Sequence, residues 1–371
     1  MRKRYISTLV ATAIAAGFVT SNAVLLTKSP FQAPGVIGDE LASTIAEVAA
    51  GGDVIDAKAN REGRHLGFDT YAYPGDDVMR AWAHASVPYE WVGYYLPAPC
   101  HDGTSWVGKR ERLAGMGWGM AVIYVGQQTW DKTPTGYETH YRSALRTQYV
   151  NKRVKVYRTV NGNRVARYVT RRVAVKRPVR VPVRVRVDAA KRPIEDCNAQ
   201  LVSATRGTIE AADAIARTEA EGFPRGSVIF LDVEYMKSVP QKMRDYYGAW
   251  TAAVLADGRY RPGAYVHTRN AATIFRDVKE VYAKAGVTEE PPFWIAGGSD
   301  FSKDKEPSDV GHAFAAMWQG VIDIVEEWNG HSLPIDVNVS ELRDPSQTSA
   351  PVDKTRVVET SSGVPVPARA R

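Results

Sequence analysis

Residues 226–235 read Gly-Ser-Val-Ile-Phe-Leu-Asp-Val-Glu-Tyr, and this stretch gives the first indication of the fold. Its apolar part, Ser227 to Leu231, is short and β-branched, which is typical of a strand buried on both faces. Asp232 and Glu234 follow, and because strand side chains alternate, the two carboxylates point the same way with backbones about 6–7 Å apart. In such a pair one carboxyl tends to stay protonated, which provides an acid and a base at one site. The alternatives are a strand that simply runs out into solvent and a pair that holds a structural cation.

The first 23 residues have the three parts of a secretory signal peptide. A basic start, residues 1–4, precedes an apolar run over 5–19 and small residues that end at Ala23. We therefore expect a secreted, extracellular protein, cleaved after Ala23 and associated with the cell wall; an uncleaved membrane anchor is the alternative. The two cysteines, Cys100 and Cys197, favour one disulfide in an exported chain, with two buried thiols as the alternative.

The net charge of +7 is unevenly distributed along the chain. Residues 152–192 contain 15 Lys and Arg and a single acid, Asp188, so this segment carries +14. The 33 basic and 40 acidic residues elsewhere give −7. The sequence therefore describes an acidic body that carries a basic insert.

The basic insert, about residues 150–192, has the pattern of a protruding β-hairpin arm. Apolar and charged residues interleave on both sides of Asn161-Gly162, a strong hairpin-turn signal, and Pro178 and Pro182 restrict the return to an edge strand. The cations of residues 152–192 favour an anionic polymer as partner, such as an anionic cell-wall chain or phospholipid head groups. Nucleic acid is not expected, because export removes the usual target and few aromatic residues are interleaved. The alternative is a solvated arm whose charges only prevent aggregation of a Val-rich edge.

A length of 371 residues accommodates one large barrel or two ordinary domains. Eight stretches are expected as strands: 66–71, 91–96, 120–125, 227–231, 261–267, 292–296, 313–319 and 333–338. Helical patterns lie between several of them, for example over 205–221. The alternation predicts a single-domain α/β fold, a (β/α)8 TIM-type barrel over residues 65–342, in which active groups gather at the carboxyl ends of the strands. We expect residues 24–64 to be a linker or pre-domain segment and residues 343–371 a disordered tail.

Six short motifs occur in the order found in a known group of enzymes. They are Gly67-Phe-Asp69, Phe230-Leu-Asp-Val-Glu234, Gly263-Ala-Tyr265, Phe293-Trp-Ile-Ala296, Trp318-Gln319 and Ile335-Asp-Val-Asn338. In this order they resemble the lysozyme-like glycoside hydrolases of family 25 and, more closely, the exported actinobacterial glycoside-hydrolase-like domain called DUF1906. The resemblance covers about residues 66–340 and is interrupted by the basic insert. It implies a TIM-type barrel and, in the family-25 relatives, cleavage of peptidoglycan between N-acetylmuramic acid and N-acetylglucosamine.

The resemblance also implies roles for individual residues. Glu234 matches the proton donor, and Asp232 matches the carboxylate that assists it or stabilises the developing cation. Asp69 and Asp336 match the other acids of the pocket. From the chain alone, Asp69 could equally well only bond backbone amides at the end of its strand.

Aromatic and amide residues are expected around the sugar. By the same resemblance, the positions that shape the sugar site are Tyr265, Trp294, Trp318 and Gln319. Tyr71 is expected to contact substrate as one of five tyrosines near strand ends, which are Tyr71, Tyr73, Tyr94, Tyr95 and Tyr235. Both groups could alternatively be core packing, the commoner fate of Trp and Tyr.

The sequence thus predicts a secreted glycoside hydrolase that acts on cell-wall polysaccharide, with no cofactor. The second hypothesis is a non-catalytic module that holds glycan in its cleft and an anionic polymer on its arm. The third is a metal-dependent phosphodiesterase with the four acids as ligands, although no His pair has metal-ligand spacing and we expect no metal. His267, at the end of a strand, could be a general base, but a single histidine there is more often structural.

Overall fold

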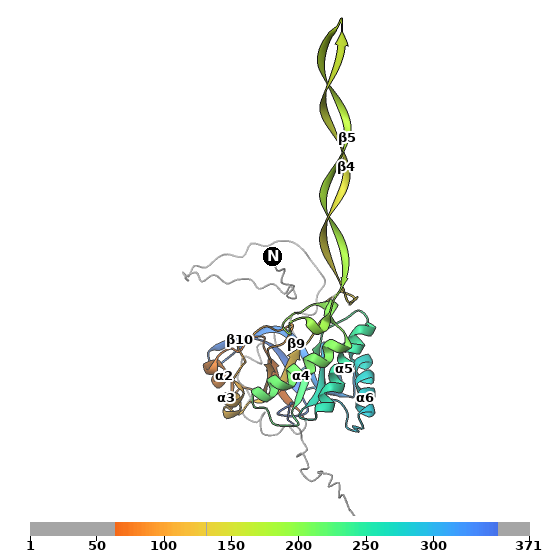
Figure 1. Cartoon of the computed structure of the whole chain (residues 1–371). Coiled ribbons are helices and arrows are strands. Elements are labelled where there is room, and N and C mark those ends of the chain that lie inside the picture. The colour runs from red at the N-terminus through yellow and green to blue at the C-terminus, as the bar shows by residue number, and fades with distance from the viewer. Residues whose placement is uncertain (1–63, 131, 348–371) are drawn as a thin grey trace, which may run out of the picture. The chain divides into compact units, whose positions relative to one another are not determined.

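The computed structural model describes residues 64–130 and 132–347, which Figure 1 shows in colour. The expected signal peptide, residues 1–23, lies outside the described residues, as do the expected linker up to residue 63 and the tail beyond residue 347. Within the described ranges, no helix is long and apolar enough to cross a membrane.

Eight strands close into a barrel, in the spatial order β1, β10, β9, β8, β7, β6, β3 and β2. Their bounds are β1 His65–Asp69, β2 Trp91–Tyr95, β3 Gly119–Val125, β6 Val228–Val233, β7 Arg261–His267, β8 Phe293–Ala296, β9 Ala315–Trp328 and β10 His331–Ser340. Each corresponds to one of the expected strands, so the predicted single-domain barrel of TIM type is confirmed. Strands β3 and β6 are buried along their whole length, which explains their continuous apolar runs.

Helices follow most of the parallel strands and pack on the outside of the barrel. They are α2 Asp76–Trp82, α3 Arg110–Gly115, α4 Ala204–Ala220, α5 Gln241–Asp257 and α6 Thr268–Lys284, with 3₁₀ turns at Ala189–Lys191, Ala199–Leu201 and Pro307–Val310. Ser203 caps α4 by accepting a hydrogen bond from the Arg206 amide, and Gly258 ends α5 in the left-handed conformation with φ 73°. Figure 1 shows α4, α5 and α6 next to one another on the barrel.

The last two strands depart from strict alternation of strand and helix. β9 runs parallel to β8, but β10 is antiparallel to both β9 and β1. Asn329 and Gly330, with φ of 50° and 77°, form a two-residue turn that joins β9 directly to β10. Because β10 is reversed, Asp336 lies inside the strand and still pairs with Asp69 at the carboxyl end of β1.

Aromatic residues fill the barrel beneath its carboxyl-terminal mouth. The ring centre of Trp294 in β8 lies 5.6 Å from that of Trp91 in β2 and 5.9 Å from that of Phe230 in β6. All three side chains are fully buried. Since residues two apart share a face of a strand, β6 presents Asp232 on the same inward side as Phe230. Asp232 therefore lies at the edge of the apolar layer formed by these aromatic side chains.

The basic insert is a two-stranded antiparallel ribbon of β4 Tyr137–Val160 and β5 Asn163–Arg186. It turns at Asn161 and Gly162, with φ of 49° and 75°, as the expected hairpin requires. The ribbon begins at Tyr137, earlier than the expected start near residue 150, because Tyr and Thr rather than Val supply the β propensity of its first part. Figure 1 shows the two strands winding around one another.

The two ends of the insert are held together at its base. The Val187 amide donates to the Gly136 carbonyl at 2.9 Å. Cys100, after β2, and Cys197, after the ribbon, form the expected disulfide. The bond links the segment that precedes the ribbon to the segment that follows it.

The chain after β10 does not become a disordered tail at residue 343, because residues 343–347 continue along the barrel. Ser346 is buried, and its hydroxyl accepts from the Val122 amide at 2.7 Å and donates to the Val228 carbonyl at 2.8 Å. Its backbone exchanges further hydrogen bonds with Met120 and Val228. Hydrogen bonds, and not burial of apolar side chains, hold residues 343–347 on the barrel. The start of the tail was therefore predicted too early, because the prediction relied on the shortage of apolar residues.

Candidate active site

Four carboxylates gather at the mouth of the barrel. Asp69 ends β1, Asp232 lies near the end of β6, Glu234 follows β6, and Asp336 pairs with Asp69 from β10. Tyr265 of β7 pairs with Asp232 in the register of the sheet. Burial, and then the charges of these four acids, raise the pKa of Tyr265 well above the ordinary value. The structure thus brings the four acids predicted from the sequence to one site.

Gln319 of β9 links two of the acids. Its Nε2 donates to Asp69 Oδ2 at 2.9 Å and to Asp336 Oδ2 at 3.2 Å. The Tyr265 hydroxyl donates to its Oε1 at 2.7 Å, which keeps the N–H groups of the amide turned toward the acids. Gln319 is buried, and because its amide is held by Tyr265 and bonds both acids, it fixes the positions of the two carboxylates.

Asp69 accepts the most hydrogen bonds of the four acids. Besides Gln319, the Tyr95 hydroxyl donates to it at 2.7 Å and the Asn338 Nδ2 at 2.8 Å. Burial raises the pKa of Asp69 and the three donors lower it, with a net shift upward. Because all three donors require an acceptor oxygen, Asp69 is well suited to carry a negative charge that the cluster retains.

Asp336 is half-buried beside Asp69. Burial, and then the charge of Asp69, raise the pKa of Asp336 to about 8. Its Oδ1 accepts a hydrogen bond from the Asp323 amide at 2.7 Å. At neutral pH the cluster therefore holds protons that isolated carboxyls would have released.

Asp232 is buried, and its Oδ1 has no hydrogen-bond partner among residues 64–130 and 132–347. Burial, followed by the charges of Glu234 and Asp69, raises the pKa of Asp232 well above its usual range. Burial and both neighbouring charges thus disfavour the charged form of this carboxyl. Buried polar atoms without partners are rare in folded proteins, and a polar group of a substrate would satisfy this one.

Gln128, which follows β3, holds the backbone that carries the Asp-x-Glu pair. Its Nε2 donates to the Asp232 carbonyl at 2.8 Å, and its Oε1 accepts from the Glu234 amide at 3.1 Å. Gln128 is itself buried. One side chain thus fixes the main chain at both acids.

Glu234 differs from its neighbour Asp232 because its side chain is exposed at the mouth. Partial loss of water around the carboxyl raises the pKa of Glu234, and a hydrogen bond from the Tyr235 amide opposes this shift. Solvent reaches the carboxyl and screens part of the effect, so the shift has less weight than that of buried Asp232. Glu234 is the acid that a bound molecule can touch.

The two predicted tryptophans do not line the mouth. Trp294 is fully buried beneath the acids, where its indole donates to Asn338 Oδ1 at 2.9 Å. Trp318 is fully buried, and its indole donates to the Gly297 carbonyl at 2.7 Å. Both positions were expected to shape the sugar site; the structure gives Trp294 a supporting role and makes Trp318 part of the packing outside it.

The five tyrosines expected near strand ends do not form a single platform. Tyr94 is fully buried, and Tyr73 donates to an acid of α2. Tyr71 is exposed after β1 and lies against His101, with ring centres 4.5 Å apart, so it stays a predicted substrate contact. The ring of Tyr235 lies 5.1 Å from that of His267, which caps α6 and is not bonded to the acids.

Two supporting residues of the site, His101 and Gln128, were not predicted from the sequence, and a third, Tyr95, was expected to contact the sugar and not to hold Asp69. Tyr95 bonds Asp69 and stacks on His101, with ring centres 5.0 Å apart. His101 is buried, and burial lowers its pKa to about 4, so it is neutral at physiological pH. All three follow or end apolar strand runs, which is the signal that could have marked them.

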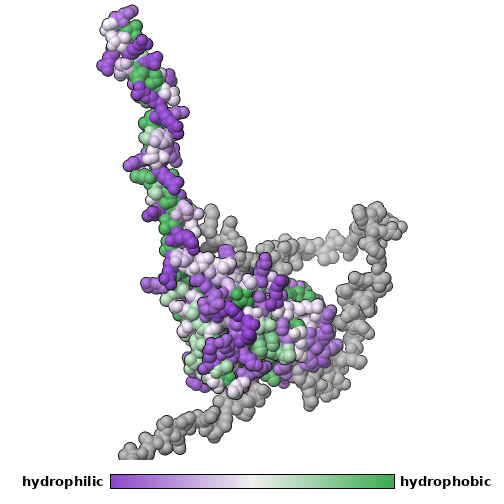
Figure 2. All heavy atoms as spheres, turned by 90° about the vertical axis from the view of Figure 1, so that its right-hand side faces the viewer, coloured by the Kyte–Doolittle hydropathy of each residue, from purple (hydrophilic) through white to green (hydrophobic). Residues whose placement is uncertain are grey.

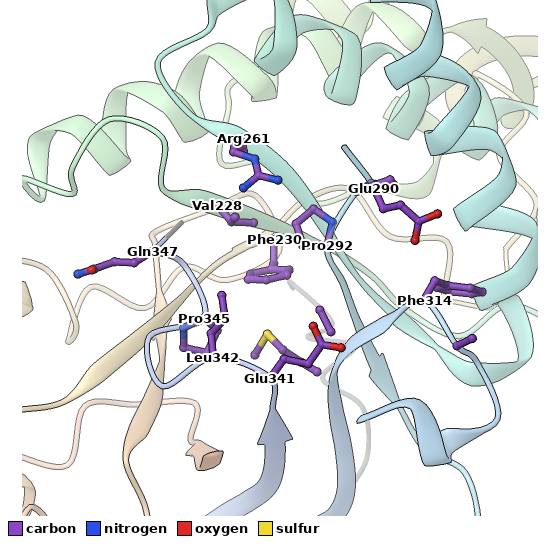
Figure 3. Close-up of a pocket in the computed structure, with 14 residues that line it drawn as sticks. Val228, Phe230, Arg261, Glu290, Pro292, Phe314, Glu341, Leu342, Pro345 and Gln347 are labelled. Atoms are coloured by element: carbon purple, nitrogen blue, oxygen red, sulfur yellow. The ribbon is translucent and has the colours of Figure 1, made fainter. Parts of the chain in front are cut away.

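Within the described part of the chain, no group of three or more His, Cys, Asp or Glu side chains is arranged to hold a metal ion. A pocket of about 250 Å³ lies at the opposite, amino-terminal end of the barrel, where the strand starts Val228 and Arg261 line it together with Leu342. Figure 3 shows Phe230 among its lining residues. This pocket is separate from the four acids.

A profile described as "Rv2525c-like, glycoside hydrolase-like domain" matches residues 80–340. The chain belongs to the Rv2525c-like glycoside hydrolase-like family. The matched segment holds seven of the eight barrel strands, together with Asp232, Glu234 and Asp336, whereas Asp69 lies before it. The expected membership of the DUF1906 group is confirmed.

Several solved structures are similar to this Rv2525c-like chain at low identity. An uncharacterized B. stearothermophilus protein is 14% identical, with 76% of this chain and 97% of that chain covered and a TM-score of 0.44. The Clostridium perfringens spore cortex lytic enzyme SleM is 11% identical, with 76% and 68% covered and a TM-score of 0.40. The Mycobacterium tuberculosis Tat-secreted protein Rv2525c is 13% identical, with 75% and 95% covered and a TM-score of 0.38. No curated protein matches the chain, and likenesses this remote carry no argument about its activity.

Proposed function

We propose that the protein is a secreted glycoside hydrolase that cuts cell-wall glycan of the peptidoglycan type. The observation that carries the proposal is the cluster of four carboxylates with raised pKa values at the mouth of a barrel whose family is described as glycoside hydrolase-like. Hydrolysis of a glycosidic bond requires one carboxylic acid to protonate the leaving oxygen and a second group to stabilise the oxocarbenium-like centre. A cluster that retains protons at neutral pH supplies the first of these.

Depth in the barrel assigns the roles of the two central acids. Glu234 is exposed at the mouth and is the acid that can reach the leaving oxygen, so we assign it as the proton donor. Asp232 lies deeper, with an oxygen that a substrate group would pair. If the sugar carries an N-acetyl group, Asp232 would orient that group as an internal nucleophile.

Asp69 and Asp336 stabilise positive charge in this scheme. Three donors hold Asp69 and favour its charged form, and Gln319 links it to Asp336. A fixed negative charge near the anomeric carbon favours the oxocarbenium-like transition state over the neutral substrate. Tyr71 and Tyr265 are proposed to border the bound sugar.

The proposal places the protein outside the cell. The expected signal peptide supplies the route, and a disulfide between Cys100 and Cys197 suits an oxidising compartment. The basic ribbon would hold the enzyme to an anionic polymer of the wall.

A non-catalytic glycan-binding module is the second candidate, and the ribbon is the observation that favours it. A module of this kind needs the cleft and the basic arm but not proton transfer. Glu234→Gln keeps the size and polarity of the side chain and separates the two candidates, because only catalysis needs the proton.

The test is release of reducing ends from purified peptidoglycan and from a panel of anionic cell-wall glycans. The native protein is compared with Glu234→Gln and with Glu327→Gln, an exposed acid of β9 that serves as matched control. We expect the rate to fall about 100-fold or more in Glu234→Gln and to stay unchanged in the control and in chelator. No release from any glycan would refute the hydrolase, and loss of release in chelator would favour the metal-dependent phosphodiesterase.

A further inference from the structure

The two faces of the ribbon have different compositions. Residues directly opposite one another in its register share a face, so odd-numbered residues of β4 lie with even-numbered residues of β5. This face, here called the Tyr–Arg face, holds all five tyrosines of the ribbon, eight Lys and Arg, and no valine. The other, the Val face, holds all twelve valines of the ribbon and seven Lys and Arg. Figure 2 shows hydrophilic and hydrophobic residues interleaved along the ribbon.

Every tyrosine of the Tyr–Arg face has an arginine over its ring, in one repeated geometry. The pairs are Tyr137 with Arg184, Tyr141 with Arg180, Tyr149 with Arg172, Tyr157 with Arg164 and Tyr168 with Arg153, at 4.3–5.0 Å from guanidinium to ring centre. In each pair the arginine precedes by two positions the residue directly opposite the tyrosine. Three of those opposite residues are Pro182, Ala174 and Ala166, which leave room beside the ring. The repeat indicates an ordered ladder of rings and cations.

The ladder leaves its hydrogen-bond donors free. A guanidinium that stacks on a ring uses its flat face, so its N–H groups still point outward in the plane and can grip a phosphate or carboxylate. None of the 15 Lys and Arg between Tyr137 and Arg186 forms an ion pair with an acid of residues 64–130 or 132–347. The tyrosines themselves are 43–62% exposed. Rings and charges are thus presented together to solvent.

The Val face is the less accessible of the two. Nine of its twelve valines are half-buried along the ribbon, and cross-strand pairs such as Val150–Val173 and Val154–Val169 stabilise a ribbon that has no third strand. The ribbon winds (Figure 1), so a flat membrane could meet only part of this face at a time. A second ribbon would bring another +14 against it. A flexible chain can follow the winding, and a polyanion is attracted by the charge.

We propose that the Tyr–Arg face binds a linear anionic glycan, with sugar rings against the tyrosines and phosphate or carboxylate groups on the guanidinium edges. Each strand has 24 residues, which makes the ribbon about 80 Å long at roughly 3.3 Å per residue. The eight Lys and Arg of the Tyr–Arg face therefore recur about every 10 Å along the ribbon, so one linear polymer can meet several of them at once. The choice of a glycan over a nucleic acid rests on the proposed function. The assignment of the Tyr–Arg face as the binding face does not, because it follows from the composition and contacts of the ribbon.

The test measures the affinity of the full chain, carrying Glu234→Gln so that no probe is cut, for end-labelled poly(glycerol phosphate) that bears hexose substituents. Fluorescence anisotropy is recorded at several salt concentrations. Ring-free polyphosphate, single-stranded DNA and anionic lipid vesicles serve as comparison ligands. One variant replaces Tyr141, Tyr149 and Tyr157 with Leu, and its control replaces Val154, Val169 and Val173 with Thr, without change of charge.

We expect the tyrosine variant to bind the hexose-bearing polymer at least about tenfold more weakly, because each aromatic contact contributes a factor of a few. The valine variant should lose less than about threefold, and neither should change the affinity for polyphosphate. Equal losses in both variants, or no loss in the tyrosine variant, would overturn the assignment of the face. Tighter binding of DNA or of vesicles than of the hexose-bearing polymer would refute a glycan as the ligand of this face.

A charge-matched pair of variants keeps the test decisive if the tyrosine variant loses its ribbon, as seen by tryptic cleavage between residues 137 and 186. Arg172, Arg180 and Arg184 on the Tyr–Arg face are replaced with Gln, and compared with Arg167→Gln, Arg171→Gln and Arg177→Gln on the Val face. We expect the first set to weaken binding several-fold more than the second, and equal effects would refute the proposal. Reducing-end release from soluble glycan, measured without Glu234→Gln, reports on the proposed function separately.

Discussion

Replacing Asp232 with Asn should stabilise the folded protein at neutral pH and remove the proposed hydrolysis. Asp232 is buried, and its Oδ1 has no hydrogen-bond partner among the described residues, so the substitution breaks no hydrogen bond of this atom. Burial and the charges of Glu234 and Asp69 raise its pKa well above the ordinary value of 3.8. The carboxyl is thus held in a setting that disfavours its charged form, and Asn has the same shape without a charge.

The effect has a defined pH dependence. A carboxyl whose pKa is raised by folding contributes stability that is fully present below the unfolded pKa and is lost as pH rises. Above about pH 4 the unfolded chain releases this proton while the folded protein keeps it, so the free energy of unfolding falls by about 1.4 kcal/mol per pH unit. The amide introduced by Asp232→Asn has no proton to release. Between pH 5 and pH 7 the stability of the variant relative to wild type should therefore rise by up to about 2.7 kcal/mol.

Urea unfolding at pH 5 and pH 7, followed by tryptophan fluorescence, measures this difference. The control is Asp300→Asn, an exposed acid after β8 whose φ of 65° suits Asn as well as Asp. The control should show no pH-dependent gain, and the urea dependence should be the same in all three proteins. A variant that is less stable than wild type at pH 7, or a difference that does not change with pH, would refute a protonated Asp232.

Two further predictions follow from single hydrogen bonds. Ser346→Ala should lower the free energy of unfolding by about 1–3 kcal/mol, because it leaves a buried amide of β3 without its partner; an unchanged urea midpoint would contradict this. Tyr95→Phe should move the acidic limb of the pH–rate profile to higher pH, since the lost hydrogen bond is one that lowers the pKa of Asp69. A limb that stays in place would show that ionised Asp69 is not required.

The barrel was predictable because its strands are continuous apolar runs that end in polar residues. The reversed direction of β10 was not predicted, although the alternation of Ile335 and Val337 with polar residues is more typical of an antiparallel strand. Asn329-Gly330 was the available signal, a turn that leaves no room for a crossover helix. The start of the ribbon was predicted too late in the chain because residues 137–149 contain no valine.

The acids of the site were found from the sequence, but the residue that holds the main chain of Asp232 and Glu234 was not. Gln128 bonds the main chain of Asp232 across 104 positions of sequence, and no local pattern reveals such a pairing. It depends on β3 and β6 becoming neighbours although the ribbon separates them in the chain. Nor does residue type reveal depth: Trp294 and Trp318 were expected at the sugar, yet both are fully buried.

A ribbon of this length can be inserted next to the site because the chain that returns from it is tied to the barrel. Arg206 of α4 is fully buried, with its charge compensated by Glu210 at 2.5 Å. Its guanidinium donates to three consecutive carbonyls, those of Arg192, Pro193 and Ile194, at 2.7–3.0 Å. Charge-assisted bonds of this kind fix the main chain that leaves the ribbon.

Gln127 completes this attachment next to the residue that holds the acids. Its Nε2 donates to the Asp196 carbonyl at 2.7 Å, and its Oε1 accepts from the Asn198 amide at 2.9 Å. Gln128, the next residue, holds the main chain of Asp232 and Glu234. The two neighbouring side chains thus bond different segments: Gln127 bonds the chain that returns from the ribbon, and Gln128 bonds the chain that carries the acids. If the ribbon holds a polymer, as proposed, we expect the bonds of Gln127 and Arg206 to keep a load on the ribbon from displacing the acids.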